Sequence, residues 1–328
     1  MNNILPINPV ILSIPRGREK GLTLIELMVT LMILGMLTTM TLRSTVALKQ
    51  QARYDLTVEK LEQIRTAIIG EHHAVYAGQR LLSGYVVDNG TLPQNLSQLV
   101  DNDAPLTKQP IQPVYNGITL KPRHALRKGY HQPYLKARIG DDNDAYRDGF
   151  GNDSHHNNYG WTVSADNDGM SITSYGSDDK AGQTDPDDIY SKDISQSILK
   201  TDWTTDISGY SIKIRTDNKD FPLTRLKALL LVYKNGGTPE WNAHRTTDSA
   251  CLIGEFDNDN PDCGTEKNLT FGTVSPVPIG QHLLVLVKSD DNSLYPDNRL
   301  APNPTDPAAQ KITLFPGAIP ETLTFTLN

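Results

Sequence analysis

GLTLIELMVTLMILGMLTTMTLR, residues 21–43, is an almost unbroken apolar stretch in a chain of 328 residues. Between Gly21 and Arg43, the only charged side chain is that of Glu26. A helix of this length would be roughly 30 Å long, which is about the thickness of the hydrocarbon core of a bilayer. The stretch therefore predicts a membrane-spanning helix that carries one carboxylate near its start.

The leader before this helix is basic near its end, where Arg16, Arg18 and Lys20 stand against Glu19. In an ordinary secretory signal the basic residues come first, and the cut removes the apolar part. Here the basic residues and Gly21 directly precede the apolar part, so a cut after Gly21 would keep it at the new N-terminus. Positive charge before the helix would hold that end on the cytoplasmic side, with the rest of the chain outside.

Glu26 is the informative residue of the stretch. An ionisable group inside a membrane segment is costly and marks a functional site by default. We expect its partner to be a cation of a neighbouring subunit, the α-amino group that cleavage would free on Leu22. The alternative is a carboxylate tolerated near a helix N-terminus through the helix dipole and snorkelling.

The hexapeptide G-L-T-L-I-E, Gly21 to Glu26, resembles the type III signal of type IV pilins and of the pseudopilins of type II secretion. The resemblance implies cleavage after Gly21 by prepilin peptidase and N-methylation of Leu22. It also implies that Glu26 registers each incoming subunit against its neighbour. The chain departs from the family in two places, since Leu22 stands where phenylalanine is usual and Arg43 where a helix-kinking proline is common.

The resemblance implies an α+β pilin fold, in which a long N-terminal helix packs on an antiparallel sheet. The pattern of the last 128 residues adds a C-terminal all-β domain. We expect a removed leader, a transmembrane and assembly helix, a pilin-like head and a β-sandwich domain, at residues 1–21, 22–78, 79–200 and 201–328. An apolar stripe at helical spacing predicts packing of the helix on the head: Tyr54, Val58, Leu61, Ile64 and Ile68.

Three motifs support a pilin-like head. The stretch 84–100, with its N-G-x-x-P turn at Asn89, is similar to the turn from the long helix into a short one in pseudopilins. Residues 148–152, D-G-F-G-N, resemble the D-P-W-G-N turn of the family. Two alternating runs on either side of residues 166–169 predict a β-hairpin.

The stretch from Ser174 to Ile189 resembles the S-x-G-x-D-G-x-x-G…D-I loop of the major pseudopilin, which binds calcium in that family. The resemblance implies Asp178 and Asp188 as the principal Ca²⁺ ligands, with Asp187 as a third. Crowded aspartates repel one another unless a cation neutralises them, and Ca²⁺ prefers such hard oxygen ligands. The alternative is an acidic, solvated loop without an ion.

The last 128 residues alternate short apolar runs with Asn, Gly and Pro turns, which predicts a β-sandwich. The expected strands are residues 210–215, 228–233, 281–288, 311–315 and 322–327. Cys251 and Cys263 are the two cysteines of the chain, and the pair fits one disulfide in an exported protein.

The net charge of −7 argues against nucleic acid as the main partner. The sequence predicts a structural subunit of a type IV pilus-like extracellular filament that displays the added β-domain. The alternatives are a type II secretion pseudopilin, or a minor or tip pilin whose β-domain is an adhesin for a host-surface or glycan ligand. We found no catalytic motif and expect no enzyme.

The expected partners follow from the same resemblance. They are further copies in a helical filament, related minor pilins, prepilin peptidase and the assembly platform of the inner membrane. We expect the chain to be anchored in the inner membrane by a single pass before assembly. It would then lie in an extracellular pilus or a periplasmic pseudopilus.

Overall fold

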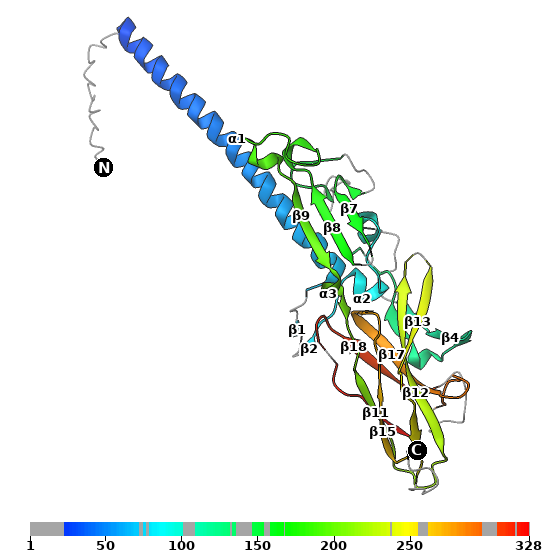
Figure 1. The fold of residues 1–328 in the computed structure, drawn as a ribbon. Helices are drawn as coiled ribbons and strands as arrows, with labels where there is room; N and C mark the ends of the chain where they lie inside the picture. The colour runs from blue at the N-terminus through cyan, green and yellow to red at the C-terminus, as the bar shows by residue number, and fades with distance from the viewer. Residues whose placement is uncertain are drawn as a thin grey trace, which may run out of the picture. The chain divides into compact units, whose positions relative to one another are not determined.

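The computed structural model describes residues 23–71, 75–76, 79–100, 109–131, 133–135, 146–153, 158–166, 168–236, 238–254, 262–296, 307–318 and 320–327. The chain divides into two compact units, Met1–Gln51 and Ala52–Asn328. A long N-terminal helix is followed by several small, mostly antiparallel sheets, so the fold is mixed α+β (Figure 1).

Helix α1 runs from Leu24 to Ile69, 46 residues, and contains no proline that would kink it. Gly70 ends the helix in the left-handed region at φ 76°, and its N–H donates to the carbonyl of Thr66 at 2.8 Å. Gly70 and Gly78 were both possible ends of the helix in sequence, and the helix ends at the first of them, because glycine adopts this φ without strain.

The threonines of the apolar part of α1 bond to the helix itself. Their hydroxyls donate to carbonyls three or four residues earlier at 2.7–3.0 Å, as in Thr30 to Leu27 and Thr38 to Leu34. A hydroxyl paired in this way needs no partner from its surroundings. These side chains are therefore compatible with an apolar environment.

The part of α1 that belongs to the second unit packs on a sheet of three antiparallel strands, in the order β7-β8-β9 (Figure 1). The strands are β7 (Thr162–Ala165), β8 (Gly169–Ser174) and β9 (Ile194–Leu199). Helix and sheet share one hydrophobic cluster, which includes Leu61, Ile64, Ile68, Trp161, Met170, Ile172 and Ile198.

The expected apolar stripe holds only in its C-terminal part. Leu61, Ile64 and Ile68 are buried, but the side chain of Val58 is 43% exposed. Thr57 is buried in its place, because its hydroxyl accepts a hydrogen bond from the backbone of Gly149 at 2.9 Å. The prediction that Val58 packs on the head was therefore wrong. The spacing of apolar residues cannot reveal that a polar neighbour is buried through a hydrogen bond.

The hairpin around residues 166–169 is confirmed. Asp166 N donates to the carbonyl of Gly169 at 2.9 Å, and its carboxylate accepts from the backbone N–H groups of Asp168 and Gly169. An aspartate that bonds the backbone two and three residues ahead closes a turn. The alternation of side chains then places Met170 and Ile172 on the face that α1 covers.

The remaining elements of the described chain are short. They are β1 (Val75–Tyr76), β2 (Gln79–Arg80), α2 (Tyr85–Asn89), η1 (Leu96–Leu99), β3 (Gln109–Ile111), β4 (Val114–Tyr115), β5 (Ile118–Thr119), η2 (Pro122–His124), β6 (Leu126–Lys128), η5 (Gly176–Asp178), η6 (Ile189–Ser191), α3 (Lys200–Trp203), β10 (Thr204–Thr205) and β16 (Val277–Pro278). The Asn95 side chain caps η1 by accepting from Gln98 N.

The C-terminal half is built from two main sheets. The larger has the order β13-β12-β17-β18, with β14 paired to the start of β12. Its strands are β13 (Pro239–Arg245), β12 (Thr224–Asn235), β17 (Gly280–Lys288), β18 (Ala309–Leu314) and β14 (Ala250–Leu252). The smaller, β15-β11-β19, contains β15 (Glu266–Thr270), β11 (Ser211–Thr216) and β19 (Thr324–Leu327). All five strands expected from the sequence are present.

The two sheets share one hydrophobic cluster. Strand β12 contributes Leu230 and strand β11 contributes Ile212, both essentially inaccessible to solvent, and Phe325 of β19 belongs to the same cluster. The opposite face of the larger sheet is covered as well, because Leu229 and Leu231 of β12 cluster with side chains from the chain segment 115–126. A strand buried on both faces reads as a continuous apolar run, which explains the A-L-L-L-V-Y sequence of β12.

The expected disulfide is present: Cys251, in β14, is bonded to Cys263 with a Cα–Cα distance of 4.6 Å.

The domain boundaries expected from the sequence, including the one at residue 200, stay predictions. Contacts do cross residue 200 within the second unit, since residues 115–126 cover the sheet formed by β12 and β17.

The N-G turn after α2 is fixed against the end of β12. Gly90 has φ 70°, and a Cβ on it would lie 2.0 Å from the carbonyl oxygen of Tyr233. On either side, Asn235 Nδ2 donates to Asn89 Oδ1 at 3.1 Å, and Thr91 Oγ1 donates to Asn235 O at 3.2 Å. Glycine is needed here both for the backbone conformation and for the close approach.

We expect Gly90→Ala to destabilise the protein more than Gly117→Ala. Both positions have positive φ, so each substitution costs about 1–2 kcal/mol of backbone strain. A Cβ added at Gly117 would meet no described atom within 4 Å. A Cβ added at Gly90 would also have to displace the backbone of Tyr233, at a further cost of about 1–3 kcal/mol. Thermal melting of both variants in detergent measures the difference, and equal melting temperatures would contradict the contact.

Candidate functional site

Three regions carry candidate functional residues: the start of α1, the acidic loop (residues 174–191) and a cavity beside the second part of α1. Gly21 and Leu22, the predicted processing site, lie outside the described residues. Glu26 lies in the first turn of α1, where its backbone N–H donates to Thr23 Oγ1 at 3.3 Å. A carboxylate at this end of a helix is favoured by the helix dipole.

The apolar side chains of α1 in the first unit are exposed. Leu24 is 78% accessible and Met40 is 70% accessible. The other large apolar residues up to Leu48 are exposed as well. By length and composition, α1 is the one helix of the described residues that could cross a membrane. Exposed apolar surface of this extent marks contact with lipid or with other proteins.

In the acidic loop, the carboxylate of Asp178 bonds within the loop. It accepts hydrogen bonds from Thr184 Oγ1 and from the backbone of Lys180, the latter at 3.3 Å. The bond from Thr184 is the main cause that lowers the pKa of Asp178 from its ordinary value. Asp178 is therefore ionised at neutral pH.

Asp188 caps the short helix η6. Its Oδ1 accepts from Tyr190 N at 2.9 Å and its Oδ2 accepts from Ser177 Oγ at 2.9 Å. Asp187 is exposed, and its backbone N–H donates to Asp185 Oδ1 at 2.9 Å. The structure thus joins Asp188 to the residue before Asp178, but it does not gather the three predicted ligands into one group.

Sequence reasoning missed Asp193, two residues after the acidic loop. Its Oδ2 accepts from Gly182 N at 3.0 Å, and its Oδ1 is buried without a hydrogen-bond partner among the described residues. A buried carboxylate oxygen without a partner is costly, and a cation is one way to satisfy it. In the described parts of the chain, no three or more His, Cys, Asp or Glu side chains lie close enough together to hold a metal ion.

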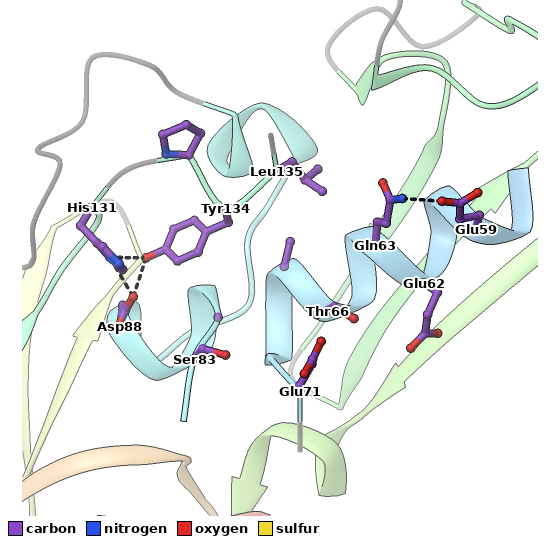
Figure 2. Close-up of a pocket in the computed structure, with 13 residues that line it drawn as sticks. Glu59, Glu62, Gln63, Thr66, Glu71, Ser83, Asp88, His131, Tyr134 and Leu135 are labelled. Atoms are coloured by element: carbon purple, nitrogen blue, oxygen red, sulfur yellow. Dashed lines mark hydrogen bonds and ion pairs between the residues drawn. The ribbon is translucent and has the colours of Figure 1, made fainter. Parts of the chain in front are cut away.

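A cavity of about 670 Å³ lies beside the second part of α1 (Figure 2). Its lining combines carboxylates with small, polar and apolar residues: Glu59, Glu62, Gln63, Thr66, Ala67, Glu71, Ser83, Gly84, Asp88, His131, Pro133, Tyr134 and Leu135. In Figure 2 Glu59 and Gln63 lie on one side, and Asp88, His131 and Tyr134 meet on the other. The acidic lining would suit a cationic group and would repel an anion.

Asp88 is 1% exposed and is stabilised by two neighbours that reach it from the segment 131–135. His131 Nδ1 and Tyr134 Oη each lie 2.9 Å from Asp88 Oδ2. Burial, followed by the charge of Asp88, raises the pKa of Tyr134 well above its usual range, so the phenol stays protonated and donates to the carboxylate. No pattern in the sequence pointed to this trio, because its members are brought together only by the fold.

His282 is a second buried titratable residue. Burial, with the nearby charge of Lys128, lowers its pKa to about 3. The imidazole is therefore neutral at physiological pH, and Nε2 donates to the carbonyl of Pro278 at 2.7 Å. A neutral histidine hydrogen-bonded to its own turn is a structural element of the core, not an acid or a base for chemistry.

Comparison with known proteins gives one family match. The family model described as "Prokaryotic N-terminal methylation motif" matches residues 16–42. No curated protein matches the chain, and no solved structure matches it. The match covers the basic leader, Gly21 and the apolar start of α1, which together are consistent with anchoring in the inner membrane before assembly. At residues 16–42 the chain therefore carries the N-terminal methylation motif of the pilin and pseudopilin family.

Proposed function

We propose that this protein is a structural subunit of a type IV pilus-like extracellular filament. The observation that carries the proposal is a methylation motif on a helix whose apolar residues are exposed and whose first turn holds Glu26. In this proposal the second part of α1 and the β7-β8-β9 sheet form a pilin-like head. The two C-terminal sheets form a β-sandwich that the filament displays, and the chain catalyses no reaction.

A pseudopilin of type II secretion is the second candidate. The resemblance of the acidic loop to that of the major pseudopilin favours it. A minor or tip pilin with an adhesive β-domain is a variant of the first proposal. All three share prepilin peptidase, the inner-membrane assembly platform and a filament of subunits as partners.

Processing provides the first test. In cells with an active prepilin peptidase, we expect the mature chain to begin at Leu22 with one added methyl group on its amine. The reason is that Gly21 has no Cβ and so leaves the peptidase unhindered access to the cut. Mass spectrometry of the N-terminal peptide measures this, and a filament subunit that keeps residues 1–21 would end the proposal.

Assembly provides the second test. We expect Glu26→Ala to insert into the membrane as well as the wild type but to form few or no filaments. An unpaired charge in hydrocarbon costs about 3 kcal/mol, so removing it eases insertion and deletes the pairing between subunits. The yield of sheared filaments measures the effect. Glu59→Ala, an exposed carboxylate further along the same helix, is the control and should assemble normally; normal assembly of Glu26→Ala would contradict the pairing.

Calcium binding by the acidic loop is a further proposal. Its support is the resemblance, the ionised Asp178 and the buried Oδ1 of Asp193. Binding would require Asp178 to exchange its bond from Thr184 for the ion, with Asp188, Asp187 and backbone carbonyls completing an oxygen shell.

We expect the full chain in detergent to melt several degrees higher in millimolar Ca²⁺ than in chelator. An ion that binds only the folded state, present at a concentration one hundred times its Kd, stabilises that state by about 2.7 kcal/mol. Asp178→Ala should abolish this difference. Asp291→Ala should retain it, because Asp291 makes a similar bond to backbone two residues ahead in another loop. Identical melting of the wild type with and without calcium would show that the loop is only acidic.

A further inference from the structure

The turn of residues 148–152, which we call the Asp148 turn, holds α1 close to the point where the helix joins the second unit. Thr57 is completely buried, and its Oγ1 accepts from Gly149 N at 2.9 Å and donates to Arg53 O at 2.8 Å. A Cβ on Gly149 would lie 2.0 Å from the Arg53 carbonyl oxygen, so only glycine allows this approach. Backbone of the turn is thus packed directly on backbone of the helix.

The carboxylate of Asp148 holds the turn in shape. Its Oδ1 accepts from three successive backbone N–H groups, those of Phe150, Gly151 and Asn152, at 2.8–3.1 Å. Its Oδ2 accepts from Asn152 Nδ2 at 2.9 Å and from Ser174 Oγ. Asp148 is 5% exposed, and a buried carboxylate with this many donors is strongly bound to one geometry.

The same turn reaches the acidic loop. Asn152 Nδ2 also donates to Gly176 O at 2.9 Å, and Gly176 N donates to Ser174 Oγ at 3.2 Å. At the other end of the loop, the ring of Tyr190 lies edge-on to the ring of Tyr54 of α1, with centroids 6.3 Å apart. Both ends of the acidic loop are therefore anchored to the same short stretch of α1, residues 53–57.

We propose that the Asp148 turn is a clamp that couples the acidic loop to α1 at residues 53–57. Order in the loop protects these helical turns from opening, and order in these turns protects the loop. The second unit begins at Ala52, so the clamp packs on the first residues of α1 within that unit. The coupling rests on hydrogen bonds and packing alone and holds whether or not the loop binds an ion or the chain assembles.

Coupling between two elements is reciprocal, which gives the experiment two arms. Hydrogen–deuterium exchange of the full chain in detergent is followed by mass spectrometry, since amide protection reports local opening. Ser174→Ala, on the loop side, removes both the bond to Asp148 and the longer bond from Gly176 N. It should speed exchange of the amides around residues 54–58 by at least about tenfold, since one net buried hydrogen bond is already worth that factor. Thr57→Val, on the helix side, should speed exchange in residues 175–191 by a similar factor.

Two matched variants act as controls. Thr173→Ala removes a neighbouring hydroxyl of β8 that bonds to Ser195 Oγ, outside the clamp, and Thr66→Val changes the same residue type as Thr57 further along α1. Neither should alter exchange in the clamp, and residues 226–232 of β12 should be unchanged in all four variants. The proposal is overturned if each clamp variant affects only its own element. It is also overturned if exchange rises equally throughout the chain, because the bonds would then support the fold as a whole.

Discussion

The structure depends on one constraint: α1 is a single helix whose two parts need different surroundings. From Leu24 to Leu48 its large apolar side chains are exposed, whereas Ile68 near its end is completely buried against β8 and β9. Apolar surface left in water costs about 25 cal/mol for each Å². The first part must therefore be covered by lipid or by other helices, and the second part already has its core.

The second part of α1 is held by a body in which early and late segments of the chain pack together. Strands β12 and β17 are buried on one face by β11 and β19, and on the other by residues 115–126. The turn at Gly90 packs on the end of β12, and the Asp148 turn packs on α1. Residues 52–328 accordingly form one compact unit, although the composition of the last 128 residues differs from that of the rest.

Much of this fold could be predicted from the sequence because it depends on local signals. The apolar run from Leu22, the D-G turn at residue 168, the alternating strands and the cysteine pair all express their structure within a few residues. The sequence left the end of α1 open between Gly70 and Gly78, since both glycines are equally good stop signals, and the structure shows that Gly70 ends it. Sheet order and the cover over β12 could not be predicted, because they follow from contacts between residues far apart in the chain.

The candidate site residues likewise include some that the sequence reveals and some that only the structure reveals. Glu26 stands out in sequence as the one charge of an apolar run. Asp178, Asp187 and Asp188 stand out as a motif, yet the hydrogen bonds that hold two of them come from Thr184, Lys180, Ser177 and Tyr190. Asp148 was noticed only as part of a turn, and Asp193 was not noticed. Their importance lies in burial and in bonds to Ser174 and Gly182, which no spacing rule reveals.

In the proposed filament, the exposed part of α1 is covered by other subunits. The most direct measurement is immunogold electron microscopy with an antibody against the C-terminal strands, on surface or periplasmic filaments from cells that express prepilin peptidase and the assembly platform. The account predicts label on the filaments themselves, together with chain in the inner-membrane fraction. Chain that is processed yet found only in the membrane fraction, with every filament unlabelled, would contradict it.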